Sequence, residues 1–374
     1  MSPAARPGAR IGVLDGYRAL AIALVLGFHY FTRWTPPHNE QNYYPYGDAL
    51  ARVPLFVHGY LGVQLFFIVS GFVISMTLLG CRDWLDFAGK RFARLFPTML
   101  LCSVLTYAVL RLVPLPVFPV QPRDFLPSLT FTEPELWSRA FGAPFRAIDG
   151  AYWSLQVEVK FYFWAALLYF SGARPRFALR FAALCAAVLA AQALAAATGA
   201  RLLASLVEEL FFPEYLPWFA AGVGFHGLYR DHRDRLGAWL VGASAAVLVG
   251  RWLLAPQADP VALAFSLAFY VLFGLFVLRP RWVAAFGSAP MVAVGAASYS
   301  LYLLHQDIGV RLLALAQGAG LAPGWSSLWV AAVLVAAMTA LAMAVYRGWE
   351  LPAKNRLLGW QRRLRGTARD SAPG

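Results

Sequence analysis

The sequence is poor in charged residues. Only 14% of its 374 residues are charged, whereas 60% are hydrophobic. Soluble domains carry about 25% charged residues, so this composition argues against a soluble protein. Apolar runs near the length that a helix needs to cross a bilayer, about 20 residues, recur along the chain. The composition therefore predicts an all-α polytopic membrane protein built as one membrane domain.

Cysteine is scarce, and acidic residues are outnumbered by basic ones. Cys81, Cys102 and Cys185 are odd in number, widely spaced and outside any CxxC, so we expect no disulfide framework and no metal site. The net charge of +13 comes largely from short loops between apolar runs. The positive-inside rule explains this excess better than a nucleic-acid partner, and we expect none.

The N-terminus also lacks a signal-peptide cleavage site. Arg6 and Arg10 precede an apolar run, but no A-x-A-like site follows it and Arg18 interrupts it. We therefore expect a retained first span. No internal repeat is found, and richness in Ala, Arg, Gly and Leu is compatible with a GC-rich bacterial genome.

Ten apolar windows predict ten transmembrane helices. They cover residues 12–32, 57–80, 95–113, 152–171, 177–198, 211–229, 236–254, 261–279, 291–314 and 326–346. With the N-terminus inside, the inner segments hold 21 Lys and Arg residues and the outer segments hold 8. This asymmetry predicts cytoplasmic N- and C-termini in a multi-pass protein of the cell (inner or plasma) membrane.

The segments between these windows have expected roles of their own. Residues 33–56 and 114–150 are polar and proline-containing, which predicts ordered outer loops or caps. Residues 199–217 are expected to form an interfacial or re-entrant helix. After a transmembrane domain of residues 1–347, residues 348–374 form a basic cytoplasmic tail that lies at the membrane surface or is disordered.

Two polar residues interrupt the first span. Arg18 and His29 are eleven residues apart, which places them on one helical face about 16 Å apart along the axis. A charged residue at the bilayer centre costs about 3 kcal/mol, so this face is expected to meet protein or water. His29 is a candidate base and Arg18 a candidate ligand for an anion or a carbonyl. Arginine snorkelling and a structural histidine are the alternative.

A basic run precedes the third window. The run, directly before residue 95, contains Lys90, Arg91 and Arg94. The two arginines are three residues apart, so on a helix they share a face. Such a fork suits phosphate groups. A plain topology signal that contacts anionic membrane lipid is an equally good interpretation.

A carboxylate lies near the start of the fourth window. Glu158 follows Ser154 by four residues and is expected to be paired, to carry a proton or to accept a sugar hydroxyl. Trp153 is a candidate contact for the acceptor or an ordinary interfacial aromatic residue. Lys160 is expected to snorkel.

A polar seam marks the ninth window. Ser298, Tyr302 and His305 fall on one side of a helix, where they either line a cavity or form structural hydrogen bonds. Glu350 follows the last window and is expected to pair with Arg347 or with a cation of an inner loop.

Taken together, these motifs resemble the acyltransferase family 3 membrane O-acyltransferases. The resemblance rests on Arg-x10-His, residues 66–74, RxxR, Trp-Ser-Leu with Glu158, residues 298–305 and Glu-x-Pro, in the family order from residue 11 to about 358. Two places depart from the family pattern. Val159 and Lys160 follow Glu158, and Gln306-Asp307 follows His305 where relatives carry a proline. The chain looks like the form without an SGNH-type domain.

The resemblance implies transfer of an acyl group, most often acetyl, from cytoplasmic acyl-CoA to a sugar hydroxyl. The acceptor would be a cell-surface glycan, a glycolipid or a glycosylated metabolite. His29, Arg18 and Glu158 would be catalytic, with His29 as a base or a covalent acyl carrier. Binding of the CoA phosphates and of the acceptor would fall to two groups of residues: Lys90, Arg91 and Arg94 for the phosphates, and Trp153, Ser154, Tyr302 and His305 for the acceptor.

Three rival functions use the same features. A transporter or exporter would also have polar seams, although the sequence has none of the repeated halves that many transporters show. A glycosyltransferase would be expected to use acidic residues of an outer loop, for which Asp124, Glu133 and Glu135 are candidates. A non-catalytic partner in envelope assembly would have no use for the Arg18 and His29 pair. The oligomeric state is left open by the sequence.

Overall fold

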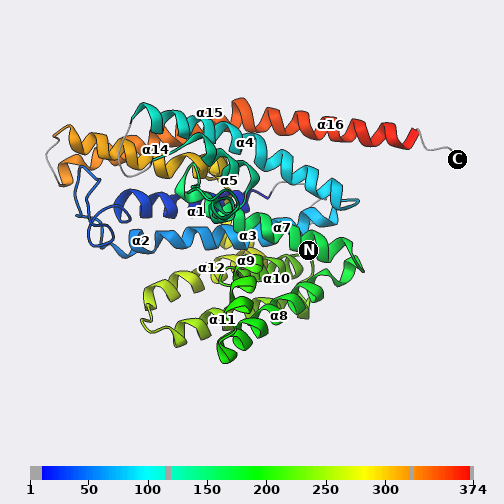
Figure 1. Cartoon of the computed structure of the whole chain (residues 1–374). Helices are drawn as coiled ribbons and strands as arrows, with labels where there is room; N and C mark the ends of the chain where they lie inside the picture. Colours follow the sequence, from blue (N-terminus) through cyan, green and yellow to red (C-terminus); the bar gives the residue numbers. More distant parts are fainter. Residues whose placement is uncertain (1–10, 114–118, 321–323, 371–374) are drawn as a thin grey trace. The chain divides into compact units, whose positions relative to one another are not determined.

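The computed structural model describes residues 11–113, 119–320 and 324–370, and these residues contain helices and no strand (Figure 1). Each of the ten predicted windows overlaps helical structure, and the window of residues 291–314 spans two helices, Ala289–Ala296 and Ser298–Gly318. The predictions for residues 1–10, for residues 114–118 and for residues 371–374 lie outside the described ranges.

The described part of the chain contains sixteen α-helices, and Figure 1 labels most of them. They are α1 (Gly12–Phe31), α2 (Pro54–Val57), α3 (Gly62–Leu79), α4 (Trp84–Leu112), α5 (Phe125–Thr130), α6 (Pro134–Phe141), α7 (Trp153–Phe170), α8 (Phe177–Thr198), α9 (Arg201–Phe211), α10 (Leu216–Arg230), α11 (Arg235–Leu254), α12 (Pro260–Leu278), α13 (Ala289–Ala296), α14 (Ser298–Gly318), α15 (Leu328–Val345) and α16 (Leu351–Asp370). Short 3-10 turns cover His58–Leu61, Pro122–Asp124, Gly150–Tyr152, Arg174–Arg176, Pro280–Gly287 and Trp325–Ser327.

Among the residues that the structure describes, seven helical stretches are long and apolar enough to cross a membrane, in agreement with a membrane protein. They are Gly12–Phe31, Pro54–Leu79, Trp84–Leu112, Arg174–Thr198, Arg235–Leu254, Pro260–Leu278 and Trp325–Arg365. The three other predicted windows overlap α7, α10 and α13 together with α14. Of these, α10 has only 15 residues, and α7 and α14 carry several polar residues. The count of ten spans and the cytoplasmic termini therefore stay predictions.

The chain folds into two compact units, a division that the sequence alone does not reveal. Unit 1 comprises Met1–Phe28, Val53–Cys81 and Ser154–Gly295, and unit 2 comprises His29–Arg52, Arg82–Trp153 and Ala296–Gly374. Helix α1 thus belongs to unit 1 up to Phe28, and its last turn, which begins with His29, belongs to unit 2.

In unit 1, α10 packs directly against α3 and α11. The α3–α10 contact is backbone against backbone. A Cβ atom at Gly222 would lie 2.2 Å from the carbonyl oxygen of Ile68, and one at Gly71 would lie 2.4 Å from that of Phe219. Because neither glycine leaves room for a side chain, these positions allow the close approach of the two helices.

Helix α9, also in unit 1, lies in the segment where an interfacial or re-entrant helix is predicted. Its C-terminal carbonyl groups accept hydrogen bonds from α7. Lys160 donates to the carbonyl of Glu209 and its ammonium lies 4.1 Å from the ring centroid of Phe212, and Trp164 donates to the carbonyl of Leu210. The structure gives the Lys160 ammonium a partner on α9, and its snorkelling towards the membrane surface stays a prediction.

In unit 2, α14 packs against α15 and α4, and α16 packs against α4. A π-helical turn, Tyr346–Glu350, joins α15 to α16, which is the red helix of Figure 1. Of the two alternatives for residues 348–374, disorder is therefore wrong for Leu351–Asp370. Their location at the membrane surface stays a prediction.

The segment of residues 33–52 is an ordered loop, as predicted. Tyr44 and Tyr46 are fully buried in unit 2, with rings stacked 5.4 Å apart. The described part of the second long loop contains α5 and α6 and ends at Asp149, directly before the turn that leads into α7.

Candidate functional site

The last turn of α1 holds His29 in unit 2. The backbone carbonyl of His29 accepts a hydrogen bond from the Tyr44 hydroxyl at 2.6 Å, and the carbonyl of Tyr30 accepts one from Tyr46. The last carbonyl groups of a helix have no partner within the helix, so these phenols supply the missing donors. Burial raises the pKa of both Tyr44 and Tyr46, which keeps them protonated. The loop thereby fixes the helix end that carries the imidazole.

His305 on α14 lies against His29. Nε2 of His305 is 3.3 Å from Nδ1 of His29, and the rings meet edge to face with centroids 4.9 Å apart. Nδ1 of His305 is 2.7 Å from the carbonyl oxygen of Tyr302. His305 is fully buried and His29 is half-buried. The sequence places these histidines in the first and ninth predicted spans, and the structure brings their imidazoles together.

Asp307 lies on α14, two residues after His305, and Asp149, directly before the turn that leads into α7, contacts its backbone. Oδ2 of Asp149 accepts the backbone N–H of Asp307 at 2.9 Å, and its Oδ1 accepts that of Ala151 at 2.8 Å. Burial, and next the carboxylate of Asp307, raises the pKa of Asp149 well above its ordinary value, which favours its acid form. Neither residue was among the predicted site residues, and Asp307 had been noted only as a departure from the family pattern. A helix-capping position directly before a helical turn is the signal that could have found Asp149.

The polar seam of α14 is buried. Ser298, Tyr302 and His305 are all less than 7% exposed, and the Tyr302 hydroxyl donates to the carbonyl of Ala151 at 2.8 Å. The contacts of Tyr302 and His305 with backbone carbonyls agree with structural hydrogen bonds, one of the two interpretations of this seam. Binding of an acceptor by Tyr302 or His305 stays a prediction.

Arg94 on α4 forms an ion pair with Glu350, as expected if Glu350 pairs with a cation of an inner segment. Glu350 is only 1% exposed and also accepts a hydrogen bond from the Ser300 hydroxyl at 2.7 Å. Together these groups join α4, α14 and the π-helical turn. The Glu350 carboxylate offsets part of the positive charge of Arg94, the residue predicted to bind the CoA phosphates.

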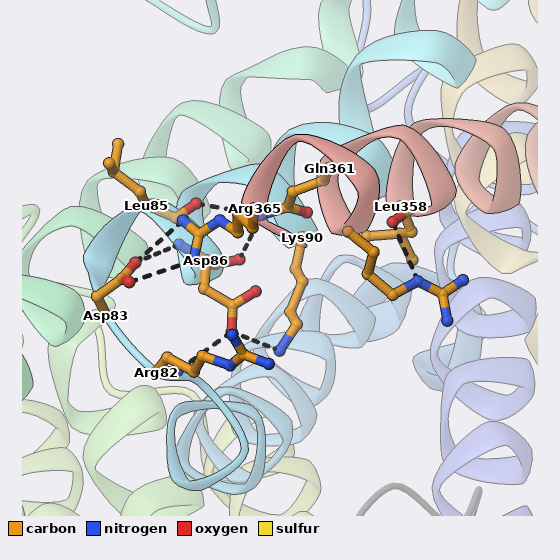
Figure 2. A network of polar contacts seen from close by, with 9 residues as sticks. Arg82, Asp83, Leu85, Asp86, Lys90, Leu358, Gln361 and Arg365 are labelled. Atoms are coloured by element: carbon orange, nitrogen blue, oxygen red, sulfur yellow. Dashed lines mark hydrogen bonds and ion pairs between the residues drawn. The ribbon is translucent and has the colours of Figure 1, made fainter. Parts of the chain in front are cut away.

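Lys90 and Arg91 lie on α4 itself, because this helix begins at Trp84, eleven residues before the predicted window. Lys90 pairs with Asp86 at 3.0 Å (Figure 2). The guanidinium of Arg91 lies 5.7 Å from the ring centroid of Phe87. The binding of CoA phosphates by these basic residues stays a prediction.

Helix α16 is fastened to the start of α4 (Figure 2). Arg365 donates two hydrogen bonds to the carboxylate of Asp83, at 3.1 and 3.2 Å, and Gln361 lies 3.4 Å from the carbonyl oxygens of Leu85 and Asp86. The hydrogen bonds from Arg365 lower the pKa of Asp83. The basic helix α16 therefore lies beside the basic run of α4.

Arg18 lies in unit 1, near the start of α1. Its guanidinium pairs with Asp15 at 3.1 Å, and the Asp15 side chain is buried whereas that of Arg18 is 23% exposed. Asp15 was not among the predicted site residues, although an acidic residue three positions before an arginine is a recognisable helical pair.

Glu158 on α7, also in unit 1, is paired, as one of its three interpretations requires. Its Oε1 accepts hydrogen bonds from Ser70 on α3 and from Tyr162, both at 2.6 Å. Ser154, the predicted neighbour on the same face, is buried, and Trp153 is 38% exposed. Tyr162 was not among the predicted site residues, although its i+4 spacing from Glu158 is visible in the sequence.

The predicted site residues therefore fall into two sets. Unit 1 holds Arg18, Ser154 and Glu158, and unit 2 holds His29, Lys90, Arg91, Arg94, Trp153, Tyr302 and His305. Within unit 2 the structure brings His29 and His305 together, and within unit 1 it gives Glu158 two hydroxyl donors.

Comparison with known proteins finds a family match over most of the chain. A family model described as "Acyltransferase domain" matches residues 11–347. The O-acetyl transferase of Shigella phage Sf6 is 32% identical over 93 residues, which cover 25% of each chain, so the match spans about a quarter of that relative. No solved structure matches the chain.

Proposed function

Because this chain belongs to the acyltransferase family whose model matches residues 11–347, we propose that it transfers an acyl group, acetyl by preference, from cytoplasmic acyl-CoA to a hydroxyl. The acceptor is a sugar of a cell-surface glycan, a glycolipid or a glycosylated metabolite, and the enzyme resides in the inner or plasma membrane. The phage relative that matches a quarter of the chain is named an O-acetyl transferase, which supports acetyl as the group.

The observation that carries this proposal is the histidine pair at the end of α1. A half-buried imidazole supported by a buried one is suited to accept a proton. In the reaction, His29 takes the proton of the acceptor hydroxyl, and the hydroxyl oxygen bonds to the thioester carbonyl carbon. The carbon–sulfur bond then breaks, and the CoA thiolate receives the proton. In a second route a nitrogen of His29 bonds to the acyl carbon as the carbon–sulfur bond breaks and CoA leaves as the thiolate. The acceptor hydroxyl oxygen then takes the acyl group from the imidazole, the nitrogen–carbon bond breaks, and the hydroxyl proton passes to the CoA thiolate.

The other residues have supporting roles in this proposal. Arg18 binds the donor or stabilises the negative charge that develops on the carbonyl oxygen. Glu158 supplies negative charge or binds the acceptor, and Trp153 and Ser154 contact the acceptor. Lys90 and Arg91 bind the CoA phosphates. Arg94 adds positive charge near these phosphates, although its ion pair with Glu350 offsets part of that charge.

The first experiment compares His29→Ala with wild-type enzyme in membranes of the native host. Transfer from [14C]acetyl-CoA into the glycan fraction should fall by about 100-fold to 10,000-fold, as expected for loss of a general base or nucleophile. His232→Ala, which changes an exposed histidine, is the matched control and should keep full activity. Undiminished transfer by His29→Ala would exclude the proposed role. Isotope counterflow of a glycan without any acyl transfer would instead identify a transporter.

The same label separates the two routes. If His29 carries the acyl group, wild-type enzyme incubated with [14C]acetyl-CoA without acceptor becomes labelled and His29→Ala does not. If His29 is only a base, neither protein retains label.

Donor binding is tested on the basic run of α4. Arg91→Ala and Lys90→Ala should each weaken binding of CoA to the purified protein by about 10-fold, and Arg94→Ala by less, as measured by calorimetry. Arg281→Ala removes a charge from another, exposed position and serves as the matched control. Equal weakening by Arg281→Ala would show that net charge, rather than a site on α4, holds CoA.

A further inference from the structure

The contacts of the two imidazoles contain information about their protons. Nδ1 of His305 lies 2.7 Å from the carbonyl oxygen of Tyr302. A carbonyl oxygen only accepts hydrogen bonds, so Nδ1 of His305 must carry the hydrogen. A neutral imidazole has a single N–H, which leaves Nε2 of His305 as a lone-pair acceptor.

That acceptor faces His29. Nε2 of His305 is 3.3 Å from Nδ1 of His29, so Nδ1 of His29 is the donor in this contact. By the same count of hydrogens, Nε2 of neutral His29 is the unprotonated, basic nitrogen. A chain of two hydrogen bonds, His29 to His305 to Tyr302, therefore selects one tautomer of His29.

Further contacts in unit 2 hold the residues of these two hydrogen bonds in place. The Tyr30 hydroxyl donates to the carbonyl of His305 at 2.8 Å, which ties α14 to the residue next to His29. A Cβ atom at Gly309 would lie 2.1 Å from the Tyr30 hydroxyl oxygen, so the glycine makes room for this contact. The Tyr302 hydroxyl is bonded to Ala151 on the other side. His305 is thus held in orientation from both α1 and the turn before α7.

We propose that His305 is a positioning residue, which holds His29 in the tautomer whose Nε2 is the base or the acyl carrier. This inference rests on the proposed function and changes the predicted role of His305, which was contact with the acceptor. In serine hydrolases a buried carboxylate orients the catalytic imidazole. Here a neutral imidazole, itself oriented by a backbone carbonyl, performs that task and adds no charge to the buried site.

Two substitutions at one position test the proposal. In His305→Gln, the amide oxygen can take the place of Nε2 and accept from His29, whereas the shorter side chain of His305→Asn matches Nδ1 and leaves His29 without this acceptor. We expect turnover within about 10-fold of wild type for His305→Gln and a loss of about 100-fold to 10,000-fold for His305→Asn, with KM for acetyl-CoA within about 3-fold in both. Equal losses in both variants, or a change confined to KM, would overturn the positioning role.

A double variant separates this inference from the proposed function. If His305 acts through His29, adding His305→Asn to His29→Ala removes no further activity, because the oriented group is already absent. A further loss as large as in the single variant would show that His305 acts independently. Full activity of His29→Ala would reject the proposed function itself, whereas an inactive His29→Ala with a fully active His305→Asn would reject the positioning role alone.

The tautomer is also observable directly. The chain has six histidines, and nitrogen-15 labelling of histidine with comparison to His29→Ala assigns the His29 signals. Wild-type protein should show a protonated Nδ1 and an unprotonated Nε2 at His29, and His305→Asn should shift hydrogen to Nε2 or give a mixture. A His29 ring with a protonated Nε2 in the wild-type enzyme would overturn the inference.

Discussion

Glu158 and Glu350 are both paired carboxylates of helical segments, but different groups hold them. Glu350 in unit 2 accepts from the Arg94 guanidinium and the Ser300 hydroxyl. Glu158 in unit 1 accepts from two hydroxyl groups, those of Ser70 and Tyr162. A carboxylate paired with a cation has its charge balanced and fastens the helices that bring the partners together. The hydroxyl groups that hold Glu158 carry no charge, so no cation among these hydrogen-bond partners balances its carboxylate.

Replacement of Glu350 by Ala should give the largest loss of stability. Arg94 would keep a largely buried guanidinium, 24% exposed, without its carboxylate. Breaking a buried ion pair on one side costs about 3–5 kcal/mol. The Tm in detergent should therefore fall clearly, and the double variant Glu350→Ala/Arg94→Ala should recover part of the loss. An unchanged Tm would show that the pair does not fasten α4 to the π-helical turn.

Replacement of Glu158 by Gln should show the reverse pattern. Acyl transfer should fall by about 100-fold, or about 2.7 kcal/mol, because the amide keeps an acceptor for Ser70 and Tyr162 but has no charge. The cost in stability should be about 1 kcal/mol. Glu350→Gln is the matched control, which should lose more stability than activity. If Glu158→Gln transfers acyl groups at the wild-type rate, the distinction between the two carboxylates fails.

The Asp83–Arg365 pair should contribute least, because both side chains are partly exposed and such pairs contribute about 0–1 kcal/mol. Its hydrogen bonds lower the pKa of Asp83 in the folded protein. The contribution is therefore complete above the unfolded pKa, about 3.9, and is lost as the pH falls through the lower folded value. Hydrogen exchange of α16 should show this loss below about pH 4, and Arg365→Ala should abolish the pH dependence. If all amide hydrogens of α16 exchanged freely in Arg365→Ala at pH 7, the Asp83–Arg365 pair would instead be the main contact that holds α16 against α4.

Helix positions follow well from the sequence, and helix ends follow less well. All ten apolar windows coincide with helices because a run of apolar residues is a local property of the chain. The start of α4 was placed too late. Asp83 accepts from the Asp86 N–H and caps the helix, and the basic residues that follow favour helix although they are not apolar. Hydropathy therefore detects only the later part of α4.

Site residues, like helices, were predictable where the signal is local in the sequence. Arg18, His29 and Glu158 were recognisable because a polar residue in an apolar span is costly and needs a reason. Asp149 could not be weighed in this way, because it lies in a loop rich in polar residues, and its burial against Asp307 becomes visible only after folding. Disorder, one of the two alternatives for the tail, does not apply to α16, where Gln361 and Arg365 have partners on α4.

The sequence by itself determined the membrane class, the sequential order of the helices, the acyltransferase resemblance and the polar residues that need an explanation. The tertiary structure decided which of those residues meet. His29 and His305 are 276 residues apart, Arg94 and Glu350 are 256 apart, and Ser70 and Glu158 are 88 apart. Hydropathy and helical periodicity extend over a few turns of chain, whereas these pairs depend on which helix faces pack together.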